Sequence, residues 1–167
     1  MKTNQNRLFI HRPLAAFSLV EVVLALGICS FCLISVLGLL PVGINTNRDS
    51  IEQTAAVGIA RAVGADFWGV SATATATSLY GILLPTSTAA TTTPAQTLFF
   101  AENGNTTDSV SAARYRVDVA YGARSNASQP AAVRILVSWP ATANPAKGQW
   151  PTNQAGSYQV VTVLNIL

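Results

Sequence analysis

The chain has 167 residues, of which 50% are hydrophobic and only 10% are charged. A typical soluble domain carries roughly 25% charged residues, so this composition indicates one small domain joined to a strongly apolar segment. The formal net charge is +3, and three of the ten basic residues lie near the start of the chain (Lys2, Arg7 and Arg12), so that the rest of the chain has seven basic and seven acidic residues. Because the rest of the chain is neutral, no basic patch is predicted on the folded domain, which argues against a nucleic-acid partner.

Residues 1–16 form a short, polar and basic leader ahead of an apolar run that extends from Phe17 to Ile44. A helix of about 20 apolar residues crosses the core of a bilayer, so the run predicts a transmembrane helix over residues 17–44 in contact with membrane lipid. The apolar core of a removable secretory signal has only about 7–15 residues, so we expect the helix to be retained. The basic leader predicts a cytoplasmic N terminus and a periplasmic C-terminal domain.

Glu21 is the one charged residue in this run. A carboxylate within a membrane helix is costly, at roughly 2.5–3.5 kcal/mol for Asp at mid-membrane. The order Phe17-Ser18-Leu19-Val20-Glu21, preceded by Ala16, resembles the class III signal of type IV pilins and type II secretion pseudopilins. That signal has a small residue, usually Gly, then an aromatic residue, Ser or Thr, two aliphatic residues and Glu. Ala16 departs from the usual Gly.

The resemblance implies a precursor that prepilin peptidase cuts between Ala16 and Phe17, followed by N-methylation of Phe17. It also implies assembly with other pilin or pseudopilin subunits on an inner-membrane assembly platform. The chain is most similar to the minor pilins and minor pseudopilins, and it is also similar to the pilin-like proteins of Verru/Chthon cassettes.

Physical chemistry gives Glu21 a role in such an assembly. Cleavage before Phe17 would create an α-amine at the start of the helix, and a neighbouring subunit's amine can meet Glu21 where the dielectric constant is low. Charge pairing is much stronger there than in water, and an unpaired buried charge is penalised. We therefore expect Glu21 to set the register of assembly. The alternative is a helix cap whose carboxylate reaches the lipid headgroups.

A break in the helix is predicted around Gly38, Pro41 and Gly43. A proline inside a helix removes one backbone donor and costs roughly 3 kcal/mol. From the residues alone, a locally melted segment and a plain kink are equally compatible with this pattern. Residues 45–69 then resume helical spacing and end near a glycine, which predicts an amphipathic continuation of the helix. Its expected apolar face comprises Ile51, Ala55, Ile59, Ala62 and Val63.

The remaining chain divides into a loop and a sheet. Residues 70–96 are rich in Ala, Thr and Ser, which predicts an irregular loop. Four β-strands are expected within residues 97–167, at 97–101, 114–121, 132–139 and 158–164. Turn-type sequences rather than helices link them, so they predict an antiparallel sheet. The fold class is therefore α+β and pilin-like, with a long N-terminal helix packed on a small antiparallel sheet.

No catalytic group of residues is evident. The only histidine, His11, lies in the leader, and Asp118 is expected to pair across strands with Arg134. Residues 102–108 carry oxygen ligands suited to calcium, but they lack the spacing of a calcium loop. We therefore predict no enzymatic activity, no metal and no cofactor.

The sequence favours a structural subunit, of minor type, in a type IV pilus-like filament or secretion pseudopilus. The alternative is an uncleaved single-pass membrane protein that presents a periplasmic binding domain. A third class, an exported enzyme on a signal anchor, is disfavoured because no active site is visible.

Overall fold

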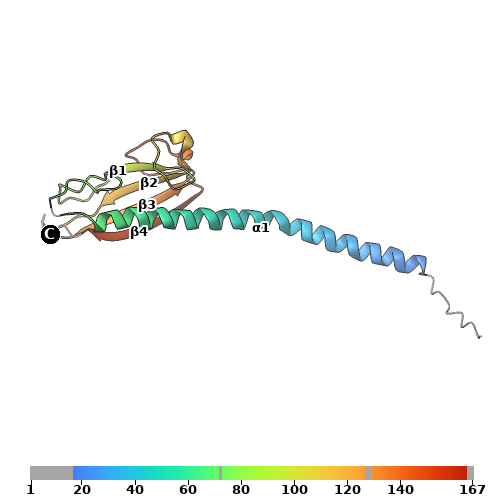
Figure 1. Cartoon of the computed structure of the whole chain (residues 1–167). Helices are drawn as coiled ribbons and strands as arrows, with labels where there is room; N and C mark the ends of the chain where they lie inside the picture. The colour runs from blue at the N-terminus through green and yellow to red at the C-terminus, as the bar shows by residue number, and fades with distance from the viewer. Residues whose placement is uncertain (1–16, 72, 127–128, 165–167) are drawn as a thin grey trace, which may run out of the picture. The chain divides into compact units, whose positions relative to one another are not determined.

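The computed structural model describes residues 17–71, 73–126 and 129–164. The chain divides into two compact units, one ending at Asn45 and the other beginning at Thr46. Figure 1 shows the elements, which are, in chain order, α1 (Leu19–Trp68), β1 (Gln96–Phe100), the 3-10 turn η1 (Val110–Ala112), β2 (Tyr115–Tyr121), β3 (Ala131–Trp139), the 3-10 turn η2 (Ala141–Ala143) and β4 (Gly156–Leu164).

The first unit contains the N-terminal half of α1, whose side chains are exposed from Phe17 onward. Its mean hydropathy reaches 2.7, and it is long and apolar enough to cross a membrane once. Two hydroxyls within this apolar stretch are satisfied inside the helix: Ser30 donates to the carbonyl of Leu26 at 2.7 Å, and Ser35 donates to that of Phe31 at 2.9 Å. Such internal pairing is what a lipid environment requires, because lipid offers these donors no partner.

Of the two alternatives predicted for the break at Pro41, the locally melted segment is wrong, and the plain kink stays a prediction. Gly38, Pro41 and Gly43 all lie within α1, which continues without a gap to Trp68. A proline removes a single N–H donor, here the one that would bond the carbonyl of Leu37, while the flanking turns keep their own hydrogen bonds. Local melting at this point is therefore not part of the structure.

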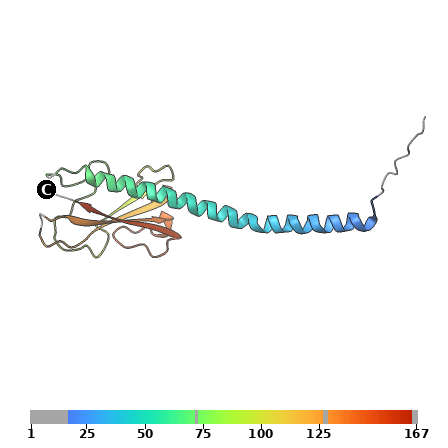
Figure 2. The same ribbon diagram turned by 90° about the horizontal axis from the view of Figure 1, so that it is seen from below.

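In the second unit, the C-terminal half of α1 lies on one face of the sheet (Figure 2). The residues it buries are Ala56, Ile59, Ala60, Val63, Asp66 and Phe67. The predicted apolar face was correct for Ile59 and Val63, whereas Ile51 is 59% exposed and Ala62 is also exposed. The buried positions recur every three or four residues, as helical packing requires, but the stripe is rotated from the predicted one because Ala56 and Ala60 allow closer approach to the sheet.

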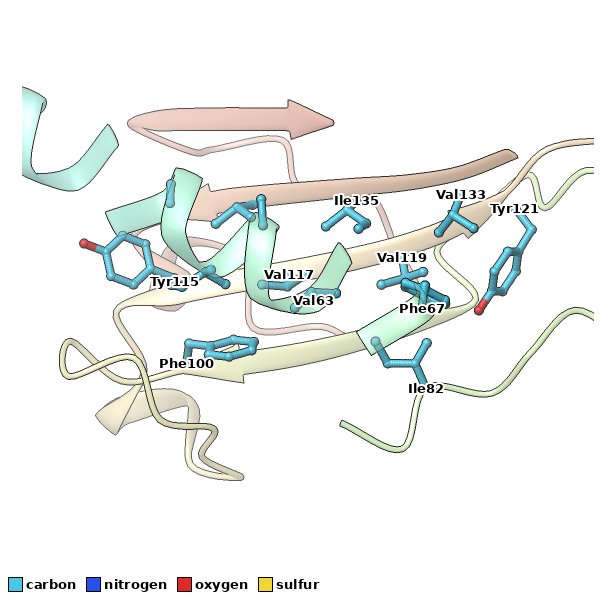
Figure 3. Close-up of a cluster of buried hydrophobic side chains, with 14 of the residues drawn as sticks. Val63, Phe67, Ile82, Phe100, Tyr115, Val117, Val119, Tyr121, Val133 and Ile135 are labelled. Carbon is cyan, nitrogen blue, oxygen red and sulfur yellow. The ribbon is translucent and has the colours of Figure 1, made fainter. Parts of the chain in front are cut away.

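The sheet has the strand order β1-β2-β3-β4, and every neighbouring pair is antiparallel. This confirms the predicted α+β layout of a long apolar N-terminal helix and a small antiparallel sheet. Each predicted strand differs from the observed one by at most two residues at either end. The core lies between α1 and the sheet, where Val63 and Phe67 meet Val117 and Val119 of β2 (Figure 3).

Residues 70–71 and 73–95 are irregular, as predicted, but they are anchored to the core. The side chain of Ile82 is fully buried, next to Phe67 (Figure 3). An isolated bridge pairs Ala76 with Leu83, and the N–H of Thr77 bonds the carbonyl of Ile82 at 2.9 Å. One apolar side chain therefore fixes an otherwise small and polar segment.

Candidate functional site

Two of the predicted processing and assembly residues, Phe17 and Glu21, lie at the start of α1. Ala16 lies outside the described residues. Phe17 precedes the helix, is 80% exposed, and is followed by Ser18 at the N-cap position. The carbonyl of Ser18 accepts the first helical hydrogen bonds, from the N–H of Glu21 at 3.0 Å and of Val22 at 3.2 Å. Glu21 therefore stands in the first turn, three residues after the cap.

This position has an electrostatic consequence. The N-terminus of a helix carries a partial positive charge, which stabilises an anion in the first turn and opposes a cation. An α-amine at Phe17 would be unfavourable at this point without a carboxylate nearby. The side chain of Glu21 is exposed, and its carboxylate accepts no hydrogen bond from any described residue. It is available to an amine of the same chain or of a neighbour.

Apolar side chains form a separate surface on the same turns of the helix. A shallow depression of about 280 Å³ is lined by Leu19, Val20, Val23 and Leu24. Leu19 and Val20 are exposed by 81% and 71%, respectively. Such a surface can pack against lipid chains or against the apolar side chains of another helix.

A second polar cluster lies in the globular unit, and it differs from the predicted one. Asp118 does not pair with Arg134. It is held by Arg116 of the same strand, whose Nε and Nη2 donate to the two carboxylate oxygens at 2.8 and 2.9 Å. Arg134 instead stacks on the ring of Trp150, with its guanidinium carbon 3.7 Å from the ring centroid.

The pair of Arg116 and Asp118 is buried, with side chains 1% and 0% exposed. Arg116 also donates to three loop carbonyls, those of Asn144 at 2.6 Å, Ala146 at 2.8 Å and Gln149. Asp118 accepts a further bond from Thr97 at 2.7 Å. The guanidinium of Arg116 and the carboxylate of Asp118 thus find their hydrogen-bond partners within the protein. The cluster therefore anchors residues 144–149 over the sheet and offers no free group for catalysis.

Sequence reasoning missed this cluster because it treated the polar face of β2 as exposed. All seven residues of β2 are buried, since α1 covers one face and residues 140–151 cover part of the other. Residues i and i+2 of a strand share a face, so an Arg-x-Asp pattern on a strand was the available signal for the pair.

Asp66 is a further buried carboxylate, 7% exposed, in the last turns of α1. It accepts hydrogen bonds from the backbone N–H groups of Leu79 and Tyr80, both at 2.9 Å, and from the hydroxyl of Ser78 at 3.3 Å. Burial acts to raise the pKa of Asp66, but the bonds from Thr77, Leu79, Tyr80 and Ser78 outweigh it and leave the pKa below its ordinary value of 3.8. Asp66 thus stays ionised and fixes the loop that follows the helix.

Within the described part of the chain, no group of three or more His, Cys, Asp or Glu side chains is placed to hold a metal ion. The acidic residues of the 102–108 segment, Glu102 and Asp108, are both exposed.

Comparison of the chain with known protein families, with curated proteins and with solved structures gave no match.

Proposed function

We propose that this protein is a subunit, of minor type, of a type IV pilus-like filament or secretion pseudopilus. The precursor is inserted as a single-pass inner-membrane protein with its C-terminal domain in the periplasm. Prepilin peptidase cuts it between Ala16 and Phe17, Phe17 is N-methylated, and the mature chain joins other subunits through α1.

The observation that carries the proposal is the division of α1 into two functional halves. From Leu19 the helix exposes an unbroken apolar surface with one acid, Glu21, in its first turn. From Ala56 to Phe67 the same helix is buried against an antiparallel sheet. A helix that is apolar all round needs lipid or other helices as its surroundings, and here the sheet supplies a cover only for the C-terminal half.

Glu21 supplies the specificity of the assembly in this proposal. Apolar helices slide against each other with little preference for register. A single carboxylate that must meet a single amine in a low-dielectric medium selects one axial position. The first turn is the right place for it, because the helix dipole disfavours an unpaired amine there.

The first experiment is mass spectrometry of the N terminus of the protein isolated from its native cell membrane. We expect a chain that starts at Phe17 with one added methyl group. An intact Met1 would contradict processing and would favour the uncleaved single-pass protein with a periplasmic binding domain. A leader variant, Ala16→Gly, is the matched control, and it should be cleaved at least as completely as the natural chain.

The second experiment replaces Glu21 by Ala. We expect normal membrane insertion and cleavage but incorporation into filaments reduced by tenfold or more. The physical reason is that removing one partner of a buried charge pair costs about 3–5 kcal/mol. The measurement is the amount of the protein in sheared or purified filaments relative to the membrane fraction. Asp49→Asn, an exposed change on the same helix, should leave incorporation unchanged. Normal incorporation of the Glu21→Ala chain would refute the register role.

A further inference from the structure

The two edges of the sheet differ in how they end. β1 is one edge and β4 is the other (Figure 1). The β1 edge is short and covered: the N–H of Thr107 bonds the carbonyl of Phe99 at 2.9 Å, and the N–H of Leu83 bonds the side chain of Gln96 at 3.0 Å. An isolated bridge between Phe100 and Thr106 adds to this cover. No comparable cover exists for β4 among the described residues.

The hydrogen-bond pattern shows which backbone groups of β4 face outward. The N–H of Gly122 bonds the carbonyl of Ala132, so the backbone groups of Ala132 point toward β2, and those of alternate residues, such as Val133, point toward β4. Val133 pairs with Thr162. It follows that the backbone N–H and C=O groups of Thr162 point toward β3. Those of its neighbours Val161 and Val163 point to the open edge of the sheet. The outward-facing set is Ser157, Gln159, Val161 and Val163, and their outward N–H and C=O groups bond no described residue.

This edge lacks the features that normally prevent strand addition. Natural edge strands are short, twisted by bulges, or protected by Lys or Pro. β4 has nine residues, no charged residue and no proline, and it pairs with β3 without a bulge from Gly156 to Leu164. Val161 and Val163 are each 58% exposed. The edge is therefore a long, flat, uncharged template for a further strand.

A groove lies beside this edge, between α1 and β4. Its volume is about 490 Å³. Its lining combines small residues of α1 with the half-buried side of β4, and Trp68, 76% exposed, stands at its border. Arg61 is the one charged residue that lines it, and it is exposed. A side chain on the helix-facing side of an added strand would enter this groove.

We propose that β4 is a docking edge for an extended segment of another protein, which adds as a fifth strand. The partner segment is apolar at alternate positions, so that its side chains fill the groove beside α1. It carries one carboxylate that meets Arg61. Main-chain hydrogen bonds give such strand addition its affinity, and the pockets for alternate side chains give it specificity. The proposal does not depend on filament assembly through the start of α1.

The charge of Arg61 favours a different protein over a second copy of this chain as the occupant of the β4 edge. β4 has no Asp or Glu, so pairing of β4 with the β4 of another copy would bring no carboxylate from that strand to Arg61. The segment that fits is acidic at one position, whereas β4 is neutral throughout.

The test uses the full chain in detergent micelles and a synthetic nine-residue probe peptide that alternates Val and Thr with a central Glu. Two matched peptides accompany it: one with the central Glu replaced by Lys, and one with alternate backbone nitrogens methylated. Binding is measured by fluorescence anisotropy of the labelled peptides. We expect methylation to weaken binding by about tenfold or more, because it removes the ladder bonds. The Glu peptide should bind about fivefold more tightly than the Lys peptide.

Two variants of the protein separate backbone pairing from charge. Val161→Pro removes an outward N–H without breaking the bonds between β3 and β4, a position that an edge strand tolerates. It should reduce binding by about tenfold, whereas Val161→Thr, which keeps the N–H, should bind normally. Arg61→Ala should abolish the preference for Glu over Lys and keep the sensitivity to methylation.

Three outcomes would overturn the proposal. Equal binding of the methylated peptide would show that no strand is added. Normal binding by the Val161→Pro chain would place the site elsewhere. A dimer of the natural chain that Val161→Pro abolishes, together with no peptide binding, would make a second copy the occupant of the edge.

Discussion

Asp66 lies at a place where a carboxylate is unfavourable on two counts, because it is buried and because it stands near the C-terminal end of α1, where the helix dipole is negative. Hydrogen bonds from Leu79, Tyr80 and Ser78 compensate for both. The donors belong to residues 78–80, in the loop that follows α1 and folds back toward its last turns. Asp66 therefore couples the end of α1 to the loop that seats Ile82 in the core.

We predict that Asp66→Asn lowers the free energy of unfolding of the globular unit by about 2 kcal/mol at neutral pH, since bonds to a charged group are worth about 1.5–3 kcal/mol. The folded-state pKa of Asp66 is lowered from 3.8, so its contribution is present above 3.8 and is lost as the pH falls through the lowered pKa. The difference between the natural chain and Asp66→Asn should thus shrink as the pH falls from neutral to below 3.8.

The measurement is urea unfolding of the full chain in micelles at both ends of this pH range. Asp108→Asn is the control, because Asp108 is exposed, and it should change stability by less than about 0.5 kcal/mol at either pH. A difference for Asp66→Asn that persists undiminished at low pH would contradict the ionised state of Asp66.

Arg116 offers a second prediction at the residue scale. Replacing Arg116 by Met leaves Asp118 buried without its cation and should cost about 3–5 kcal/mol. The double variant Arg116→Met, Asp118→Leu removes both charges and should cost less than the sum of the two single changes. Urea unfolding of the four chains gives the coupling free energy. If the losses in the free energy of unfolding were additive, the two residues would act independently, which would contradict the bidentate pairing of Arg116 with Asp118.

Hydrogen exchange supplies a separate readout of the same cluster. The N–H of Gly148 donates to the hydroxyl of Thr97, which in turn donates to Asp118. Loss of Arg116 should therefore increase the exchange rate of the Gly148 amide more than that of the β3 amides.

At the scale of elements, the sequence predicted the helix and the strands, because their formation depends on local patterns of residues. The apolar period of α1 and the alternation in β2 and β3 are properties of consecutive residues, and these elements were found within two residues of their predicted ends. What failed depends on residues distant in the chain. The rotation of the buried stripe toward Ala56 and Ala60, and the burial of both faces of β2, are set by which surface packs on which.

Pro41 illustrates the same limit within a single helix. A locally melted segment and a plain kink were equally compatible with its sequence, and α1 runs through it without melting. Local chemistry gives the cost of one missing hydrogen bond, but the outcome depends on the long helical stretches on either side, which each retain their full set of bonds. The candidate site at Glu21 could be recognised from five consecutive residues, whereas the open edge at β4 required knowledge of the strand order.

At the scale of the whole molecule, the chain comprises two units that differ in how their apolar side chains are covered. The described residues of the unit that ends at Asn45 expose their apolar side chains, and none of them is buried. The unit that begins at Thr46 contains the buried cluster, which includes residues of α1 from Ala56 to Phe67 and residues of all four strands. The globular unit should therefore fold without the apolar half of the helix, provided that it retains the helical residues that close its core.

We predict that a chain of residues 46–167 is soluble without detergent and unfolds cooperatively in urea, because every residue of the buried cluster lies within it. A shorter chain, residues 62–167, is the matched control, since it lacks Ala56, Ile59 and Ala60. Loss of three core side chains exposes one face of the sheet and should leave it without a cooperative transition. Near-ultraviolet circular dichroism, which reports on Trp139 and the aromatic side chains packed near it, distinguishes the two. If residues 46–167 gave no near-ultraviolet signal, the N-terminal half of α1 would be required for folding, and the division of the helix into an exposed apolar half and a core half would be wrong.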